Sequence, residues 1–128
     1  MRYLLDTNIC SRLVREQRSV FLRASVRDWS DCAISAITAH ELEFWATATG
    51  TRRIQAVQDF LGAAVIVPFD AAAAMAAAKL RSTLRSQQLS SFDALIAGHA
   101  LALGCVLVTA DADFKRVPGL RTENWLKT

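Results

Sequence analysis

Phe92-Asp93-Ala94-Leu95-Ile96-Ala97 is the stretch of sequence that decides the fold. An acid stands ahead of small and apolar residues that predict a helix over 92–103, which Gly104 ends. Ser91 is the expected N-cap, and this places Asp93 in the first turn of the helix. The apolar run at 105–108 follows at once and predicts a strand. A helix that leads directly into a strand is typical of an α/β protein.

The rest of the chain repeats this alternation of short apolar strands and helices. Strands are predicted at 3–5, 32–35 and 64–67, with a weak edge strand at 120–122. Helices are predicted at 9–14, 20–29, 38–49, 51–61 and 70–85, and the third of these opens with a capping box formed by Thr38 and Glu41. The pattern predicts a parallel sheet of four to five strands covered by helices on both faces, in a single domain of residues 1–128.

The charge, the cysteines and the absence of an evident signal peptide or membrane span indicate which partners and which cell compartment to expect. Its 15 basic and 12 acidic residues give a net charge of +3, which permits a nucleic-acid partner without requiring one. The three cysteines, Cys10, Cys32 and Cys105, match no zinc pattern and are expected to be reduced. No signal peptide or membrane span is evident, so we expect a cytoplasmic protein that does not enter a membrane.

Four acids from distant parts of the sequence are expected to meet at one edge of the sheet. Asp6 directly follows the first strand, and Asp111 lies three residues past the strand that ends at Val108. A helix that leaves a parallel strand starts at the carboxyl edge, which places Glu41 there. The helix over 92–103 feeds the next strand, so it must also begin at that edge and carry Asp93 with it. Ligands of such sheets bind at this edge.

Carboxylates gathered in this way repel each other unless a cation neutralises them. Mg²⁺ or Mn²⁺ prefers carboxylate oxygens, and such an ion suits phosphodiester hydrolysis because it activates water and stabilises charge on the phosphate. Each acid has a simpler interpretation as a helix cap or turn residue. Capping does not, however, require all four acids to share one edge.

These residues resemble a known family. The segments that carry the resemblance, in order along the whole chain, are Leu4-Leu5-Asp6-Thr7-Asn8-Ile9, Ser35-Ala36-Ile37-Thr38-Ala39-His40-Glu41-Leu42, Phe92-Asp93-Ala94-Leu95-Ile96-Ala97-Gly98-His99-Ala100, Leu107-Val108-Thr109-Ala110-Asp111-Ala112-Asp113-Phe114 and Val117-Pro118-Gly119-Leu120-Arg121-Thr122-Glu123-Asn124-Trp125. They are similar to the PIN-domain toxins of bacterial toxin–antitoxin pairs, the VapC group. The loop at 86–91 departs from the pattern, because many relatives have glycine and proline there.

The resemblance implies a PIN-like three-layer α/β/α sandwich and a Mg²⁺-dependent endoribonuclease, with RNA as its substrate and tRNA as one candidate. It also implies inhibition by a cognate VapB-type antitoxin, and a homodimer. Asp6, Glu41 and Asp93 fall on the three core acids of the family. Asp111 falls on the fourth, more variable position, and Asp113 is its rival.

Supporting and binding residues complete these expectations. Thr7 and Thr109 match polar positions that flank the acids, and Asn8 belongs to the same motif. Basic residues that could neutralise RNA phosphates, with a solvated surface as the alternative interpretation, are Arg81, Arg85, Lys115 and Arg116. Aromatic residues that could form a groove for an antitoxin helix, with core packing as the alternative, are Phe21, Phe44, Trp45 and Phe60.

Other functions remain open on the sequence alone. The same fold could act on DNA or in RNA processing, or it could be a non-catalytic binding module. A phosphorylation-dependent receiver domain is a further small α/β fold that binds a metal. It would need paired acids after the first strand and a lysine after the last, and neither is found here.

Overall fold

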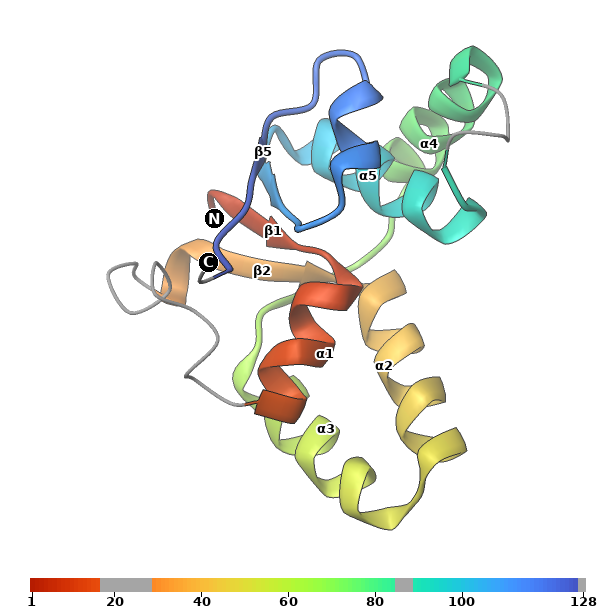
Figure 1. Cartoon of the computed structure of the whole chain (residues 1–128). Helices are drawn as coiled ribbons and strands as arrows, with labels where there is room; N and C mark the ends of the chain where they lie inside the picture. The colour runs from red at the N-terminus through yellow and green to blue at the C-terminus, as the bar shows by residue number, and fades with distance from the viewer. Residues whose placement is uncertain (17–28, 85–88, 127–128) are drawn as a thin grey trace.

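The computed structural model describes residues 1–16, 29–84 and 89–126, and within them five parallel strands form one sheet (Figure 1). The strand order is β3-β2-β1-β4-β5. The strands are β1 (Tyr3–Leu5), β2 (Cys32–Ser35), β3 (Ile66–Val67), β4 (Val106–Val108) and β5 (Thr122–Glu123). β1 is central, and its three residues are fully buried because helices cover both faces of the sheet.

The α-helices are α1 (Thr7–Glu16), α2 (Ala36–Thr49), α3 (Thr51–Ala63), α4 (Ala71–Leu84) and α5 (Ser91–Leu103). Two short 3₁₀ turns, η3 (Trp29–Asp31) and η4 (Ala112–Arg116), precede β2 and follow β4. Gly50 joins α2 to α3 with a φ of 113°, and Gly104 ends α5 in the left-handed conformation, as the sequence predicts. None of the described helices is long and apolar enough to cross a membrane.

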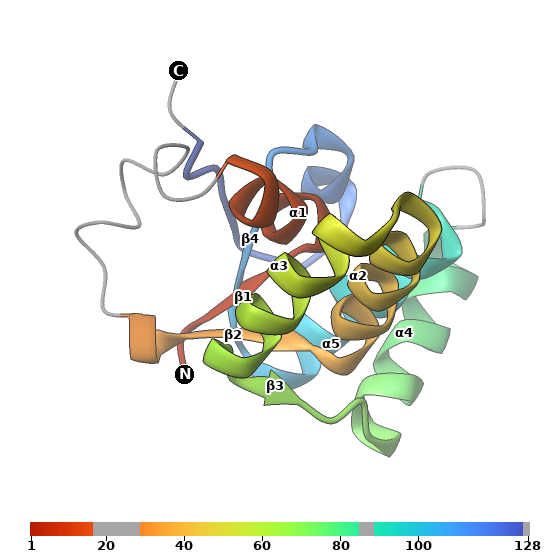
Figure 2. The same cartoon turned by 90° about the horizontal axis from the view of Figure 1, so that it is seen from below.

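The helices form two layers, one on each face of the sheet (Figures 1 and 2). α1, α2 and α3 pack on the face reached by Tyr3 and Leu5, whereas α4 and α5 pack on the opposite face, which Leu4 reaches. This alternation follows from the two-residue period of a strand. The fold is therefore the expected three-layer α/β/α sandwich around a parallel sheet. Its three cysteines are buried and free.

Two details of the prediction need correction. The weak edge strand predicted at 120–122 lies instead at Thr122–Glu123, where it pairs with Leu107 and Val108. Most of the helix predicted at 20–29 lies outside the described residues, and its last residue, Trp29, belongs to η3.

The strand order places a topological switch point between β1 and β4. The chain runs from β1 outward through β2 to β3 and then returns to the other side of β1 as β4. The backbone N–H of Asp6 donates to the carbonyl of Val108 at 3.0 Å, so the two carboxyl ends lie side by side. In open α/β sheets such a reversal opens the crevice in which ligands bind. The fold therefore points to this edge before any side chain is considered.

Candidate functional site

Asp6 lies at the switch point, and its carboxylate is almost completely buried. Its Oδ1 accepts a hydrogen bond of 2.8 Å from the backbone N–H of Ile9, so Asp6 caps α1. Burial raises the pKa of Asp6 to about 6, although the Thr109 hydroxyl and the Ile9 N–H favour the charged form. The charges of Asp93 and Asp111 raise this pKa further. Asp6 therefore has a capping role and also faces two of the other predicted acids.

Glu41 reaches the same region from α2, where a hydroxyl of α1 holds it. The Thr7 hydroxyl donates to Glu41 Oε1 at 2.5 Å and also lies 3.1 Å from the hydroxyl of Thr38. Partial burial raises the pKa of Glu41, and the charge of Asp93 adds to this effect. The Thr7 hydroxyl therefore holds the carboxylate of Glu41 in place.

The predicted start of α2 is wrong. α2 begins at Ala36 with Ser35 as its N-cap, and the Ser35 hydroxyl accepts from the backbone N–H of Ile37 at 3.1 Å. Thr38 therefore lies inside the helix, no capping box forms with Glu41, and Glu41 stands in the second turn rather than the first. The edge of the sheet that Glu41 reaches is unchanged, because α2 still leaves β2 at its carboxyl end.

Asp93 stands in the first turn of α5, as predicted, but the cap differs by one residue. Ser90, not Ser91, is the N-cap, and its hydroxyl accepts from the backbone N–H of Asp93 at 3.1 Å. Partial burial raises the pKa of Asp93, and the charges of Asp111 and Asp113 raise it further. The charge of Asp93 also raises the pKa of Asp6 and of Glu41. Asp93 therefore interacts electrostatically with every other predicted acid.

Asp111 and Asp113 follow β4 and occupy different positions relative to the other acids. The carboxylate of Asp111 caps η4 by accepting from the backbone N–H of Asp113 at 2.9 Å, while its own N–H donates to the Thr109 hydroxyl at 3.0 Å. The charge of Asp111 raises the pKa of both Asp6 and Asp93. Asp113 is exposed, and its charge raises the pKa of Asp93. These contacts favour Asp111 as the fourth member of the cluster.

The acid cluster is defined here as Asp6, Glu41, Asp93 and Asp111. Its donor chemistry fits a hard divalent cation, because it consists of carboxylate oxygens with raised pKa values on three of its four members. Among the described residues, no three His, Cys, Asp or Glu side chains lie close enough together to form a metal-binding group.

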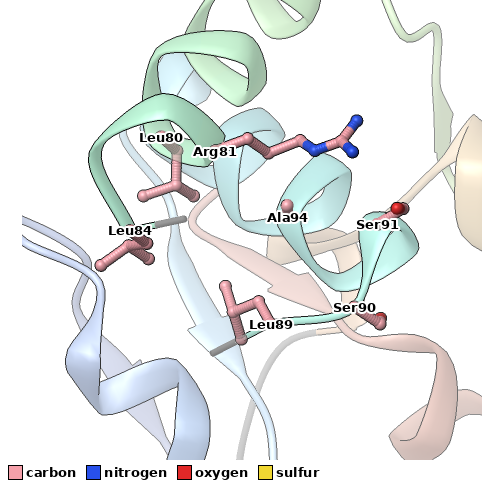
Figure 3. A pocket seen from close by; sticks show the side chains of 7 residues that line it. All are labelled: Leu80, Arg81, Leu84, Leu89, Ser90, Ser91 and Ala94. Carbon is pink, nitrogen blue, oxygen red and sulfur yellow. The ribbon is translucent and has the colours of Figure 1, made fainter. Parts of the chain in front are cut away.

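The predicted basic residues are distributed around this edge. Arg81 lines a pocket of about 200 Å³ between α4 and the start of α5, and Figure 3 shows its side chain extending over α5 toward Ser91. Leucines form much of the lining, namely Leu80, Leu84 and Leu89. Lys115 and Arg116 are exposed in the last turn of η4. Arg85 lies outside the described residues.

A second hollow runs from the acid cluster along α1 and α2. It has a volume of about 360 Å³, and Thr7, Asn8 and Glu41 line one part of it. The other lining residues are Ser11, Arg15, Leu42 and Trp45. Of the aromatic residues predicted to form a groove, Trp45 lies here, Phe44 is exposed on α2, Phe60 packs against the core, and Phe21 lies outside the described residues.

Ser35 and His99 were not predicted to belong to the site, yet they join two of its helices. The Ser35 hydroxyl lies 2.8 Å from Nδ1 of His99, a buried residue of α5. Burial lowers the pKa of His99, which favours the neutral ring. Ser35 caps the helix that carries Glu41, and α5 carries Asp93. A serine at the end of a predicted strand, directly before a helix, is the sequence signal that could have identified the cap.

Comparison with known proteins matches the chain to one family. The model of the PIN domain matches residues 3–120. The chain is 34% identical to the tRNA(fMet)-specific endonuclease VapC of Shigella flexneri, over 98% of each chain. It superposes on VapBC2 of Rickettsia felis, bound to a promoter DNA fragment, with a TM-score of 0.87 and 30% identity over 98% and 99% of the two chains. A DNA-bound VapBC of Salmonella typhimurium gives a TM-score of 0.88 and 29% identity over 98% of each chain.

Proposed function

Because the chain belongs to the PIN-domain family and to its VapC group, we propose that it is an endoribonuclease toxin held inactive by a VapB-type antitoxin. The observation that carries this proposal is the acid cluster at the switch point between β1 and β4. Four carboxylates from four separate segments act on one another there. A binding module would have no need to bury Asp6 at such an electrostatic cost.

We propose Mg²⁺, with Mn²⁺ as a substitute, as the cofactor that the acid cluster holds. When bound, the ion neutralises the carboxylates, lowers the pKa of water and stabilises charge on the phosphate and the leaving oxygen. Asp93 is the central ligand, because it interacts electrostatically with each of the other three acids of the cluster. Asp111 is proposed as the fourth ligand in preference to Asp113.

The neighbouring hydroxyl groups orient these carboxylates. Thr7 donates to Glu41, and Thr109 interacts with Asp6 while also accepting from the N–H of Asp111. Because hydroxyl groups hold the carboxylates of Glu41 and Asp6, these two acids need little reorganisation when the substrate arrives. Asn8 lines the adjoining hollow between α1 and α2.

We propose that the RNA backbone crosses this edge between α4 and η4. Arg81 lies on one side, and Lys115 and Arg116 lie on the other, so phosphates on either side of the cut would meet a cation. A single-stranded loop suits a shallow edge of this kind better than a duplex, because its bases are unstacked. A tRNA is the candidate substrate that the names of the Shigella and Salmonella relatives suggest.

The antitoxin is proposed to place a segment in the hollow between α1 and α2, where Leu42 and Trp45 offer apolar contacts beside Glu41. A segment in this position would block access to the acid cluster. The toxin is further proposed to form a homodimer and to act in the cytoplasm, where its RNA substrates are present.

Cleavage of total cellular RNA tests this function. Purified toxin free of antitoxin is expected to give discrete fragments with Mg²⁺ or Mn²⁺ and none with EDTA. Asp93→Asn is expected to lower the cleavage rate at least about a hundredfold while leaving the fold intact. Asp59→Asn, an exposed acid of α3, is the matched control and should cleave like wild type. Cleavage of DNA alone, or full activity of Asp93→Asn, would contradict the proposal.

A further inference from the structure

Two exposed aromatic rings lie beside the acid cluster, and core packing does not explain them. His40 of α2 and Phe92 of α5 stack with ring centroids 6.1 Å apart and an interplanar angle of 25°. Phe92 is 44% exposed, and His40 is exposed as well. A stacked pair of this geometry is favourable, but leaving the apolar face of a phenylalanine in water is not. The two rings therefore leave an aromatic surface open to solvent beside the acids.

The ring pair, defined as His40 and Phe92, borders the acids on two helices at once. His40 directly precedes Glu41, and Phe92 directly precedes Asp93. Successive residues of an α-helix point about 100° apart, so each ring occupies the sector next to that of an acid. The two acids act on each other electrostatically, and the two rings stack on each other. The ring pair therefore forms one border of the acid cluster, between α2 and α5.

We propose that the ring pair is a platform on which one unpaired base of the RNA substrate stacks, beside the phosphate that is cut. This inference rests on the proposed ribonuclease function. Phenylalanine and histidine are among the side chains on which splayed-out RNA bases stack. Every base has a flat π-face, so the platform holds a nucleotide in position without selecting its identity. It also favours single-stranded substrate, because a base inside a duplex cannot present its face.

The ring pair and the cation on the other side of α5 would bind different parts of the RNA, namely a base and the phosphates. Arg81 lies on the α4 side of α5, whereas the ring pair lies on the α2 side, and Asp93 belongs to the first turn of α5. Cations attract the backbone along its length but leave its register undefined. A base fixed on the ring pair would set that register and so determine which phosphate reaches the acids.

A substitution at Phe92 tests the platform through its effect on substrate binding. Phe92→Leu keeps an apolar side chain but removes the π-face, and it is expected to raise KM about fivefold to a hundredfold with kcat near wild type. Phe92→Tyr keeps the π-face and should restore a KM close to wild type. The matched control is Trp29→Leu, because Trp29 is an exposed aromatic residue ahead of β2, at the opposite edge of the sheet. Its KM should not change.

An RNA oligonucleotide spanning the cut site, with single abasic nucleotides at successive positions, identifies the stacked base. Wild type should lose about fivefold to a hundredfold in kcat/KM at one position beside the cut, and Phe92→Leu should show no such loss there. An equal loss in both proteins, or no sensitive position, would overturn the platform while the ribonuclease stands. Weaker antitoxin binding by Phe92→Leu with unchanged cleavage would assign the rings to the protein partner instead. A wild-type toxin that cleaves no RNA would overturn the function and the platform together.

Discussion

The Asp6 carboxylate stabilises a helix end by capping it, but its burial beside other acids destabilises its charged form. Its carboxylate caps α1 through the N–H of Ile9, which stabilises the helix, yet the residue is only 3% exposed and faces other acids. The cap needs an oxygen acceptor and does not need a charge. We propose that the charge serves the cofactor, so the cost of burying it should lower the stability of the metal-free chain. This separation of roles makes Asp6 the residue at which stability and function are most easily distinguished.

We expect Asp6→Asn to stabilise the metal-free protein at pH 7.5 by about 1–3 kcal/mol. Asparagine keeps the oxygen that accepts from Ile9 and removes the buried charge. The pKa of Asp6 is about 6 in the folded chain, against 3.8 ordinarily, so the folded state binds the proton more tightly. The stability that this proton confers on wild type is present at low pH and is lost as the pH rises from about 4 to about 6.

Urea unfolding in EDTA at pH 5.0 and at pH 7.5 measures this effect. The advantage of Asp6→Asn should be larger at pH 7.5, and the contribution of His99 cancels because both proteins contain it. Asp6→Ala is the control that removes the cap together with the charge, and it should be less stable than Asp6→Asn by about 1 kcal/mol at both pH values. An Asp6→Asn variant that is less stable than wild type at pH 7.5 would contradict this account.

At the scale of elements, the position of Asp93 depends on how closely α5 approaches α4. Gly98 of α5 faces Ala77 of α4, and a Cβ placed on Gly98 would lie 2.5 Å from both the Cα and the backbone nitrogen of Ala77. Backbone atoms cannot move aside as a flexible side chain can. The two small residues therefore set the separation of the helices, and with it the pocket that Arg81 lines.

We expect Gly98→Ala to destabilise the protein by about 3 kcal/mol, because the helices must separate to admit one methyl group. Gly62→Ala in α3 is the matched control, since a Cβ there has no heavy atom within 4 Å. It should stabilise the protein by about 0.5–1 kcal/mol through the helix propensity of alanine. Thermal and urea unfolding of the two variants measure both effects. Equal stabilities would show that α4 and α5 do not pack as closely as described.

The contact between Ser35 and His99 is a second link between elements, and it joins helices from opposite faces of the sheet. Ser35 ends β2 and caps α2, while His99 belongs to α5. The contact is made by Nδ1 of the buried His99 ring. The helices that carry Glu41 and Asp93 are thereby held to one strand end.

For the molecule as a whole, the sequence predicts the alternation of elements well and their exact ends less well. The central strands are apolar on both faces, which is why 3–5 and 32–35 are predicted as they occur. The caps of α2 and α5 were misplaced because Ser, Thr and Glu near a helix start satisfy several capping patterns equally. Which residue caps depends on where the preceding strand ends, and tertiary packing decides that.

The sequence predicts that the acids share one edge of the sheet. It does not predict which of them interact with one another. Chain direction in a parallel sheet fixes which end of each helix lies at the carboxyl edge. The order of strands was not predicted, so the sequence did not reveal that Asp6 and the β4 end meet at a switch point. The contacts of Ser35 with His99 and of His40 with Phe92 join residues more than 50 positions apart, and no local pattern encodes them.

A crystal structure of the toxin soaked with Mn²⁺, with anomalous diffraction recorded at the manganese edge, tests the central claim most directly. We predict an anomalous peak among the carboxylates of Asp6, Glu41, Asp93 and Asp111, absent from crystals of the Asp6→Asn and Asp93→Asn variants. A strong peak elsewhere on the chain, or no peak in a protein whose RNA cleavage requires Mn²⁺, would contradict the assignment of the acid cluster as the catalytic metal site.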